Sequence, residues 1–207
     1  MSLPTEVNSP RYNHRQENKF SRAMGRLMNA VTVSPMTEQE IKTYRDTALG
    51  QLVFTRTYLK QMLDTVPAEQ WSVIPPGAPS HLAWQVGHLA VAQYGLMLFR
   101  QRGRAEGDLE LMPSWLRKRF GKGTSPSTDT GEIPHRDQLI EILDRIDAQV
   151  RHEVTEMPLA QFSEATDMPY AVFPTKLGAL LFCPIHESIH IGQIGLIRRL
   201  LGFDPVR

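Results

Sequence analysis

Four long stretches of the sequence repeat apolar residues at the spacing of an α-helix, and this pattern limits the fold more than any other feature. They cover about residues 38–66, 81–101, 136–156 and 176–201. Proline- and glycine-rich segments separate them, and no stretch alternates with the two-residue period of a β-strand. The sequence predicts an all-α fold: a four-helix bundle with a long connection, residues 103–134, between the second and third helices.

Capping and breaking residues set the expected helix boundaries. Thr37 and Glu40 have the spacing of a capping box, and Ser80 and Thr175 are the expected N-caps of the second and fourth helices. The residues expected to end the four helices are Pro67, Gly103, Pro158 and Gly202.

Three shorter segments carry their own predictions. Residues 114–120 are expected to form a short helix inside the connection, and residues 169–174 are expected to form a loop. Pro184 lies within the fourth helix, where it is expected to kink the helix or to mark where it restarts.

The N-terminal 35 residues differ in character from the rest of the chain. They are polar, carry several arginines and show only a brief apolar run, which predicts a disordered arm. Residues 36–207 are long enough to bury one good core, so we expect a single bundle domain there.

Charge and composition exclude several classes of protein. The formal net charge is only +1, which does not predict binding to nucleic acid. No stretch has the length of a membrane span, and the N-terminus lacks the apolar core of a signal peptide. The single cysteine, Cys183, excludes an internal disulfide, and together these features favour a cytoplasmic location.

The fourth helical stretch contains a pair of histidines with the spacing of metal ligands. His186 and His190 are four residues apart and share one face of the helix, on a stripe expected to face the bundle centre. A third ligand must come from elsewhere, and His88 is the candidate because it is central in the most apolar helix. His81, near the start of the same helix, is expected to be exposed to solvent. The alternative to a metal is that each buried histidine makes its own hydrogen bonds.

The same segment matches H-E-x-x-H, in which the glutamate of zinc proteases is the general base. No histidine or glutamate follows His190, so the downstream ligand of those proteases is missing. This weakens the comparison with zinc proteases, but Glu187 is still a candidate catalytic base, with a surface or outer-sphere role as the alternative. Gln193 shares the histidine face and would orient a ligand or a water, or else bond to backbone. Cys183 is interpreted as a buried, inert cysteine rather than a ligand.

Three segments resemble the DinB-like family, also described as YfiT-like metal-dependent hydrolases. They are WQVGHL, LMPSWLRKRFGKGTSPS and HESIHIGQIGLIRRLLGFDP, and the likeness covers about residues 38–205. The resemblance implies a four-helix bundle that holds a divalent ion (zinc, nickel or iron) on His88, His186 and His190. It also implies that some relatives use a low-molecular-weight thiol such as bacillithiol or mycothiol, and that relatives often form homodimers.

Two functional hypotheses for a small-molecule site follow, and a bare helical scaffold without metal is the third alternative. In the first, the chain is a metal-dependent hydrolase or thiol S-transferase, in which the ion lowers the pKa of a bound water or thiol. In the second, it is a non-enzymatic metal-binding stress-response protein, in which the metal only stiffens the bundle. An open coordination position would favour the enzyme.

Overall fold

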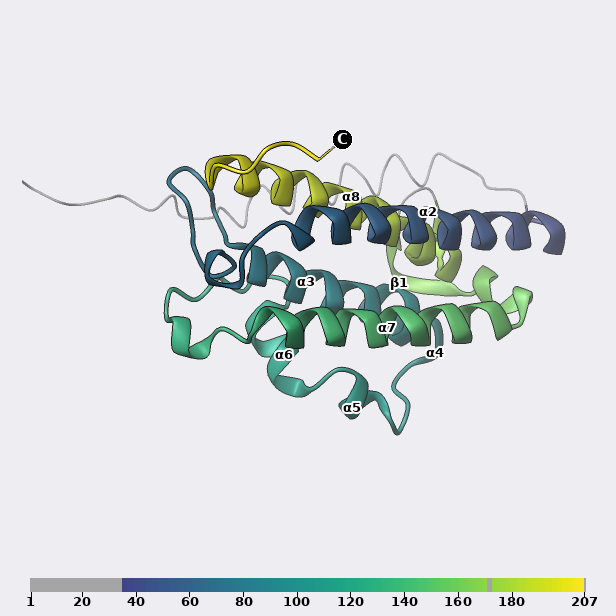
Figure 1. Cartoon of the computed structure of the whole chain (residues 1–207). Helices are drawn as coiled ribbons and strands as arrows, with labels where there is room; N and C mark the ends of the chain where they lie inside the picture. Colours follow the sequence, from purple (N-terminus) through teal and green to yellow (C-terminus); the bar gives the residue numbers. More distant parts are fainter. Residues whose placement is uncertain (1–34, 171–172, 207) are drawn as a thin grey trace, which may run out of the picture. The chain divides into compact units, whose positions relative to one another are not determined.

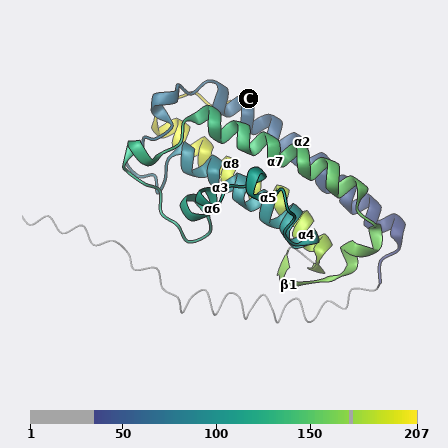
Figure 2. The ribbon, with the colours of Figure 1, turned by 90° about the horizontal axis from the view of Figure 1, so that it is seen from below.

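The computed structural model describes residues 35–170 and 173–206, and the arm predicted for residues 1–35 lies almost wholly outside this range. The architecture is all-α, as predicted. The long helices are α2 (Glu38–Asp64), α3 (Leu82–Tyr94), α7 (Arg136–Glu156) and α8 (Lys176–Leu200), and they run alongside one another as a bundle (Figures 1 and 2). α2 lies against α8, α3 lies against α7, and α3 also contacts α8.

Helix α2 begins at the predicted capping box. The Thr37 hydroxyl accepts a hydrogen bond from the Glu40 amide, and the Glu40 carboxylate accepts one from the Thr37 amide. At the far end of the bundle, α8 ends in a Schellman motif. Gly202 adopts a φ of +92°, and the amides of Gly202 and Phe203 bond back to the carbonyls of Arg199 and Arg198. Helix α8 is assigned as one continuous helix through Pro184.

The second predicted helix is more complex than the sequence indicated. Its N-cap is His81 rather than Ser80, because the His81 ring nitrogen Nδ1 accepts the Trp84 amide at 3.0 Å. After Tyr94 the chain passes through a π-helical turn, η2 (Gly95–Phe99), and a last turn, α4 (Arg100–Arg102). Gly103, with a φ of +79°, ends it at the predicted position.

The long connection lies along the outer side of α3 and α7 (Figure 1). It contains the predicted short helix, α6 (Ser114–Phe120), and an unpredicted turn of helix, α5 (Asp108–Leu111). Short 3-10 turns occur at η1 (Ala68–Gln70), η3 (Thr130–Glu132) and η4 (Leu159–Ser163).

The expectation of a loop at residues 169–174 and of no strand was wrong. β1 (Ala165–Tyr170) and β2 (Phe173–Thr175) form an antiparallel hairpin with Ala165 opposite Thr175. Both strands contact α8. Segments this short, each with a proline, carry no readable period, so tertiary contact decides their conformation.

Helix α8 forms much of the bundle core. The expectation that no stretch has the length of a membrane span was wrong. By length and composition α8 is a candidate span, the one such helix among the described residues, and 44% of its most apolar window is buried. It also carries the buried charged residues Glu187 and Arg198 and contacts α2, α3 and the hairpin. These contacts identify it as the core helix of the bundle.

Candidate metal centre

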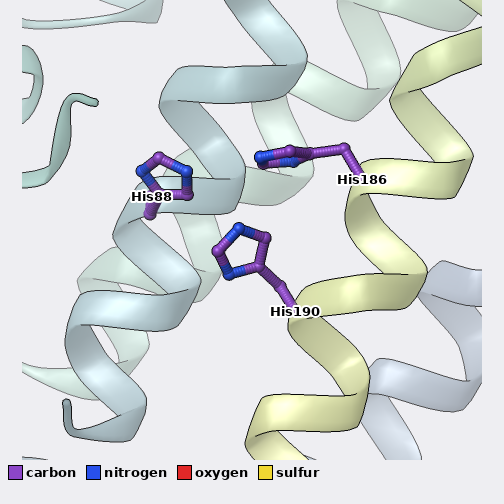
Figure 3. Close-up of side chains that lie close together, drawn as sticks. All are labelled: His88, His186 and His190. Atoms are coloured by element: carbon purple, nitrogen blue, oxygen red, sulfur yellow. The ribbon is translucent and has the colours of Figure 1, made fainter. Parts of the chain in front are cut away.

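Three histidines from two helices converge inside the bundle. His88 comes from α3, and His186 and His190 come from successive turns of α8 (Figure 3). One ring nitrogen from each lies within 4.8 Å of the others, and no other histidine, cysteine or carboxylate of the described residues joins this group. His88 and His190 are 9% and 8% exposed, and His186 is half-buried. The contact between α3 and α8 therefore brings together the three residues named from the sequence.

The connection orients the His88 ring. Its Nδ1 lies 2.7 Å from the Phe120 carbonyl oxygen at the end of α6. A carbonyl only accepts, so we assign the proton to Nδ1, which leaves the Nε2 lone pair available. The Trp84 ring stacks on the His88 ring, with the two ring centroids 4.9 Å apart and the two planes inclined by 6°.

A glycine allows the connection to approach α3 this closely. A Cβ atom at Gly87 would lie 2.5 Å from the Phe120 ring, closer than real contacts permit. The Trp84 indole N–H also donates to the Thr124 hydroxyl at 3.2 Å. The WQVGHL segment thus contains the histidine, the tryptophan that stacks on it, and the glycine that lets Phe120 of the connection approach α3.

His190 is held by a glutamine from the facing helix. Its Nδ1 lies 2.6 Å from the Gln85 side-chain oxygen. The Gln85 amide nitrogen donates to the Ser80 hydroxyl at 2.6 Å and to the Gln193 side-chain oxygen at 2.9 Å. Gln193, predicted to orient a ligand or a water, is therefore linked to His190 by hydrogen bonds through the Gln85 side chain.

Burial keeps these imidazoles neutral. Burial, followed by the neighbouring His186 and His88, lowers the pKa of His190 to about 3. Burial and then His88 lower the pKa of His186 to about 4, and burial lowers the pKa of His88 against the opposing bond to Phe120. At neutral pH the cluster presents uncharged nitrogen donors, the form that binds metal.

Glu187, the candidate base, lies in a different network. It is 2% exposed, and its carboxylate oxygens lie 2.9 Å and 3.2 Å from Nε and Nη2 of Arg56 on α2. The structure thus ties its carboxylate to α2 rather than to the histidines. Cys183 is buried as predicted, and burial raises the pKa of its thiol well above the usual value.

The expectation that His81 is exposed to solvent was wrong. It is 1% exposed because the connection folds over it, with its Nε2 lying 3.1 Å from the Ser127 carbonyl. The hydrogen bonds of Gln85 to His190 and to Ser80 were not predicted, although helical spacing places Gln85, three residues before His88, on the same side of the helix as His88.

A family model described as the DinB superfamily matches residues 51–194, a range that contains all three histidines. A search of curated proteins found no match to the chain. The match covers well over half of the sequence, and the chain belongs to the DinB superfamily.

Proposed function

We propose that this DinB-superfamily protein binds a divalent metal ion on His88, His186 and His190, and that it is a metal-dependent enzyme whose substrate is a small molecule. The observation that carries the proposal is the convergence of three neutral imidazoles without a fourth histidine, cysteine or carboxylate among the described residues. Three protein ligands with a position left over are typical of catalytic rather than structural metal sites.

The donor set fits a first-row divalent ion. Imidazole nitrogen suits zinc, nickel and iron alike, so the site does not select one of them by ligand type. When bound, such an ion would lower the pKa of a water or a thiol at the remaining position. The chain's own contribution is to hold neutral rings in place: the Phe120 carbonyl orients His88, and Gln85 orients His190.

Between the two chemistries of the hypothesis, thiol S-transfer is the better supported. Hydrolysis would call for a base beside the attacking water, and Glu187 is bonded to Arg56 instead. A thiol with an acidic tail would instead require positive charge near the site. Four basic residues, Arg117, Lys118, Arg119 and Lys122, lie within three positions of Phe120 in the sequence and are exposed, and the Phe120 carbonyl contacts His88.

The alternative is a non-enzymatic metal-binding protein. It is favoured by the fact that the three ligands join α3 to α8, so an ion would cross-link two helices of the core. This alternative predicts a thermal shift on chelation without turnover of any thiol or ester substrate.

Metal binding is tested first. Elemental analysis and Zn²⁺ titration should find one ion per chain. Replacing any one of the three histidines with alanine should weaken Zn²⁺ affinity by more than the roughly 10–100-fold expected when an outer-sphere partner is lost. His152→Ala is the matched control because His152 is exposed on α7. Absence of stoichiometric metal, or loss of binding in the control alone, would refute the site.

Catalysis is tested on the same proteins. The metal-loaded chain is incubated with bacillithiol, mycothiol or glutathione and a thiol-reactive electrophile. Metal-dependent conjugation that His88→Ala abolishes would support S-transfer. Metal binding with no turnover in this screen or on an ester panel would favour the non-enzymatic alternative.

A further inference from the structure

We infer that Gln85 is a positioning residue of the metal centre: it holds His190 in the tautomer that carries its proton on Nδ1 and directs Nε2 toward the ion. This inference rests on the proposed metal-binding function. It concerns a residue of α3 acting on a ligand of α8, and so it links the two helices that build the site.

The surroundings of Gln85 indicate which way its amide points. The amide nitrogen has two acceptors, Ser80 Oγ at 2.6 Å and Gln193 Oε1 at 2.9 Å. Its two protons are then used, which leaves the carbonyl oxygen for His190 Nδ1 at 2.6 Å. Gln85 is 1% exposed and Ser80 is 3% exposed, so bulk water does not compete for these groups.

The opposite amide orientation has an opposite chemical consequence. Ser80 and Gln193 would both have to donate to Gln85, and the amide nitrogen would donate to His190 Nδ1. The proton of a neutral His190 ring would then sit on Nε2, and neither ring nitrogen would be free for an ion. The direction of one buried amide therefore decides whether His190 is a ligand.

The facing ligand has the same arrangement with a fixed partner. The Phe120 carbonyl lies 2.7 Å from His88 Nδ1 and, being a carbonyl, accepts in every orientation. Ligating histidines generally donate their other ring nitrogen to such a partner, which fixes the tautomer and raises the basicity of the ligand. Gln85 does for His190 what the connection does for His88.

Substitutions at Gln85 separate this role from simple packing. Gln85→Leu removes the acceptor, so His190 should populate both tautomers and affinity for Zn²⁺ should fall by about 10–100-fold. Gln85→Glu keeps an acceptor for Nδ1–H, since Ser80 and the Gln193 amide can both donate to it. We expect this variant to retain the tautomer and to bind Zn²⁺ at least as tightly as wild type.

Gln93 provides a matched control. It is on the same helix and is also 1% exposed, but its side chain bonds to Arg56 and Asp147 instead of a histidine. Gln93→Leu should lower the melting temperature while leaving the His190 tautomer and the Zn²⁺ affinity unchanged.

The experiment measures the tautomer and the affinity separately. Long-range ¹⁵N–¹H correlation spectra of the metal-free full-length chain at neutral pH report which nitrogen of His190 carries the proton, and competition with a chelator reports Zn²⁺ affinity. Nδ1–H in wild type and in Gln85→Glu, with a mixture and weaker binding in Gln85→Leu, supports the inference. Nε2–H in wild type overturns it even if Gln85→Leu does not fold, as does an unchanged tautomer or affinity in Gln85→Leu. Failure of wild type to bind Zn²⁺ would refute the proposed function, whereas the tautomer would still be measured.

Discussion

Removing the Glu187 carboxylate should destabilise the fold strongly without removing the metal. Glu187 and Arg56 are 2% and 3% exposed and form two charge-assisted hydrogen bonds. Arg56 also donates to the Gln93 side chain at 3.0 Å and to the Leu143 carbonyl at 3.4 Å. One guanidinium thus joins α2 to α8, α3 and α7, and Glu187 is the carboxylate that pairs with it.

The magnitude follows from leaving a buried charge without its partner. Glu187→Leu should cost about 3–5 kcal/mol of unfolding free energy. For a domain of this size each kcal/mol lowers the melting temperature by roughly 2–4 °C, so the expected fall is roughly 6–20 °C. The double variant Arg56→Met with Glu187→Leu should recover most of this loss. It should not recover all of it, because the Gln93 oxygen then lacks its donor, at a cost of about 1–3 kcal/mol.

The assay is urea unfolding of the wild type, both single variants and the double variant, with metal content measured on each. The expected coupling between the two sites is large, and the metal stoichiometry is unchanged. If Glu187→Leu had the same urea midpoint of unfolding as the wild type, the stabilising role assigned to the buried Arg56–Glu187 pair would be refuted. If that variant were also stable, metal-loaded and inactive, Glu187 would be the catalytic base after all.

Three further predictions concern other parts of the molecule. Although burial raises the pKa of Asp108, hydrogen bonds led by the one from Arg102 lower it to about 2. The contribution of this carboxylate to the unfolding free energy is therefore complete above the unfolded pKa of 3.8 and is lost as the pH falls through about 2. Asp108→Asn should flatten this part of the pH dependence of stability measured by urea unfolding. Gly87→Ala should cost about 1–3 kcal/mol in thermal unfolding, because the new methyl group displaces the Phe120 ring. Ile185 and Ile189, 48% and 53% exposed, are four residues apart on one face of α8, and this exposed apolar pair should lie in a homodimer contact, so Ile189→Asp should convert a dimer to a monomer in light scattering.

The glycine and isoleucine predictions each have a control within the chain. Gly192→Ala on α8 adds a methyl group that would meet nothing within 4 Å and should not destabilise the fold. Leu109 on α5 is also 53% exposed, and Leu109→Asp should leave the oligomeric state unchanged. A monomeric wild type, or equal effects of the two glycine changes, would contradict the corresponding prediction.

The long helices could be read from the sequence because each carries its own local information. The capping box at Thr37 and the glycine at position 202 act within one turn of the helix end that they define. The hairpin at residues 165–175 and the turn α5 lack such information. Asp108 is held by Arg102 and Tyr94, contacts that exist only after the chain has folded.

The three histidines were predictable for a similar reason, and their partners were not. An i, i+4 pair on an apolar stripe is visible in the sequence, and a third histidine in the most apolar helix completes it. The Phe120 carbonyl that orients His88 lies 32 residues away, and every residue has a carbonyl. Gln85 is 105 residues from His190, so only the packing of α3 on α8 makes it a partner.

Near the site, the buried polar groups of α8 fall into two layers, one with Glu187 and one with the histidines, and this separation bears on the chemistry proposed for the site. On α8, Glu187 faces Arg56 of α2, while His190, three residues later, faces His88 and Gln85 of α3. The arginine takes up the one carboxylate that the H-E-x-x-H segment supplies, and the histidine layer stays neutral. A divalent ion held there would keep its full charge, which favours an anionic ligand at the remaining position. A thiol and a water must both lose a proton to become that ligand, and a thiol, with an ordinary pKa of about 8.5, loses it more readily than water, at about 15.7. Because Glu187 is paired with Arg56 and does not lie beside the ion as a base, the arrangement favours the thiol.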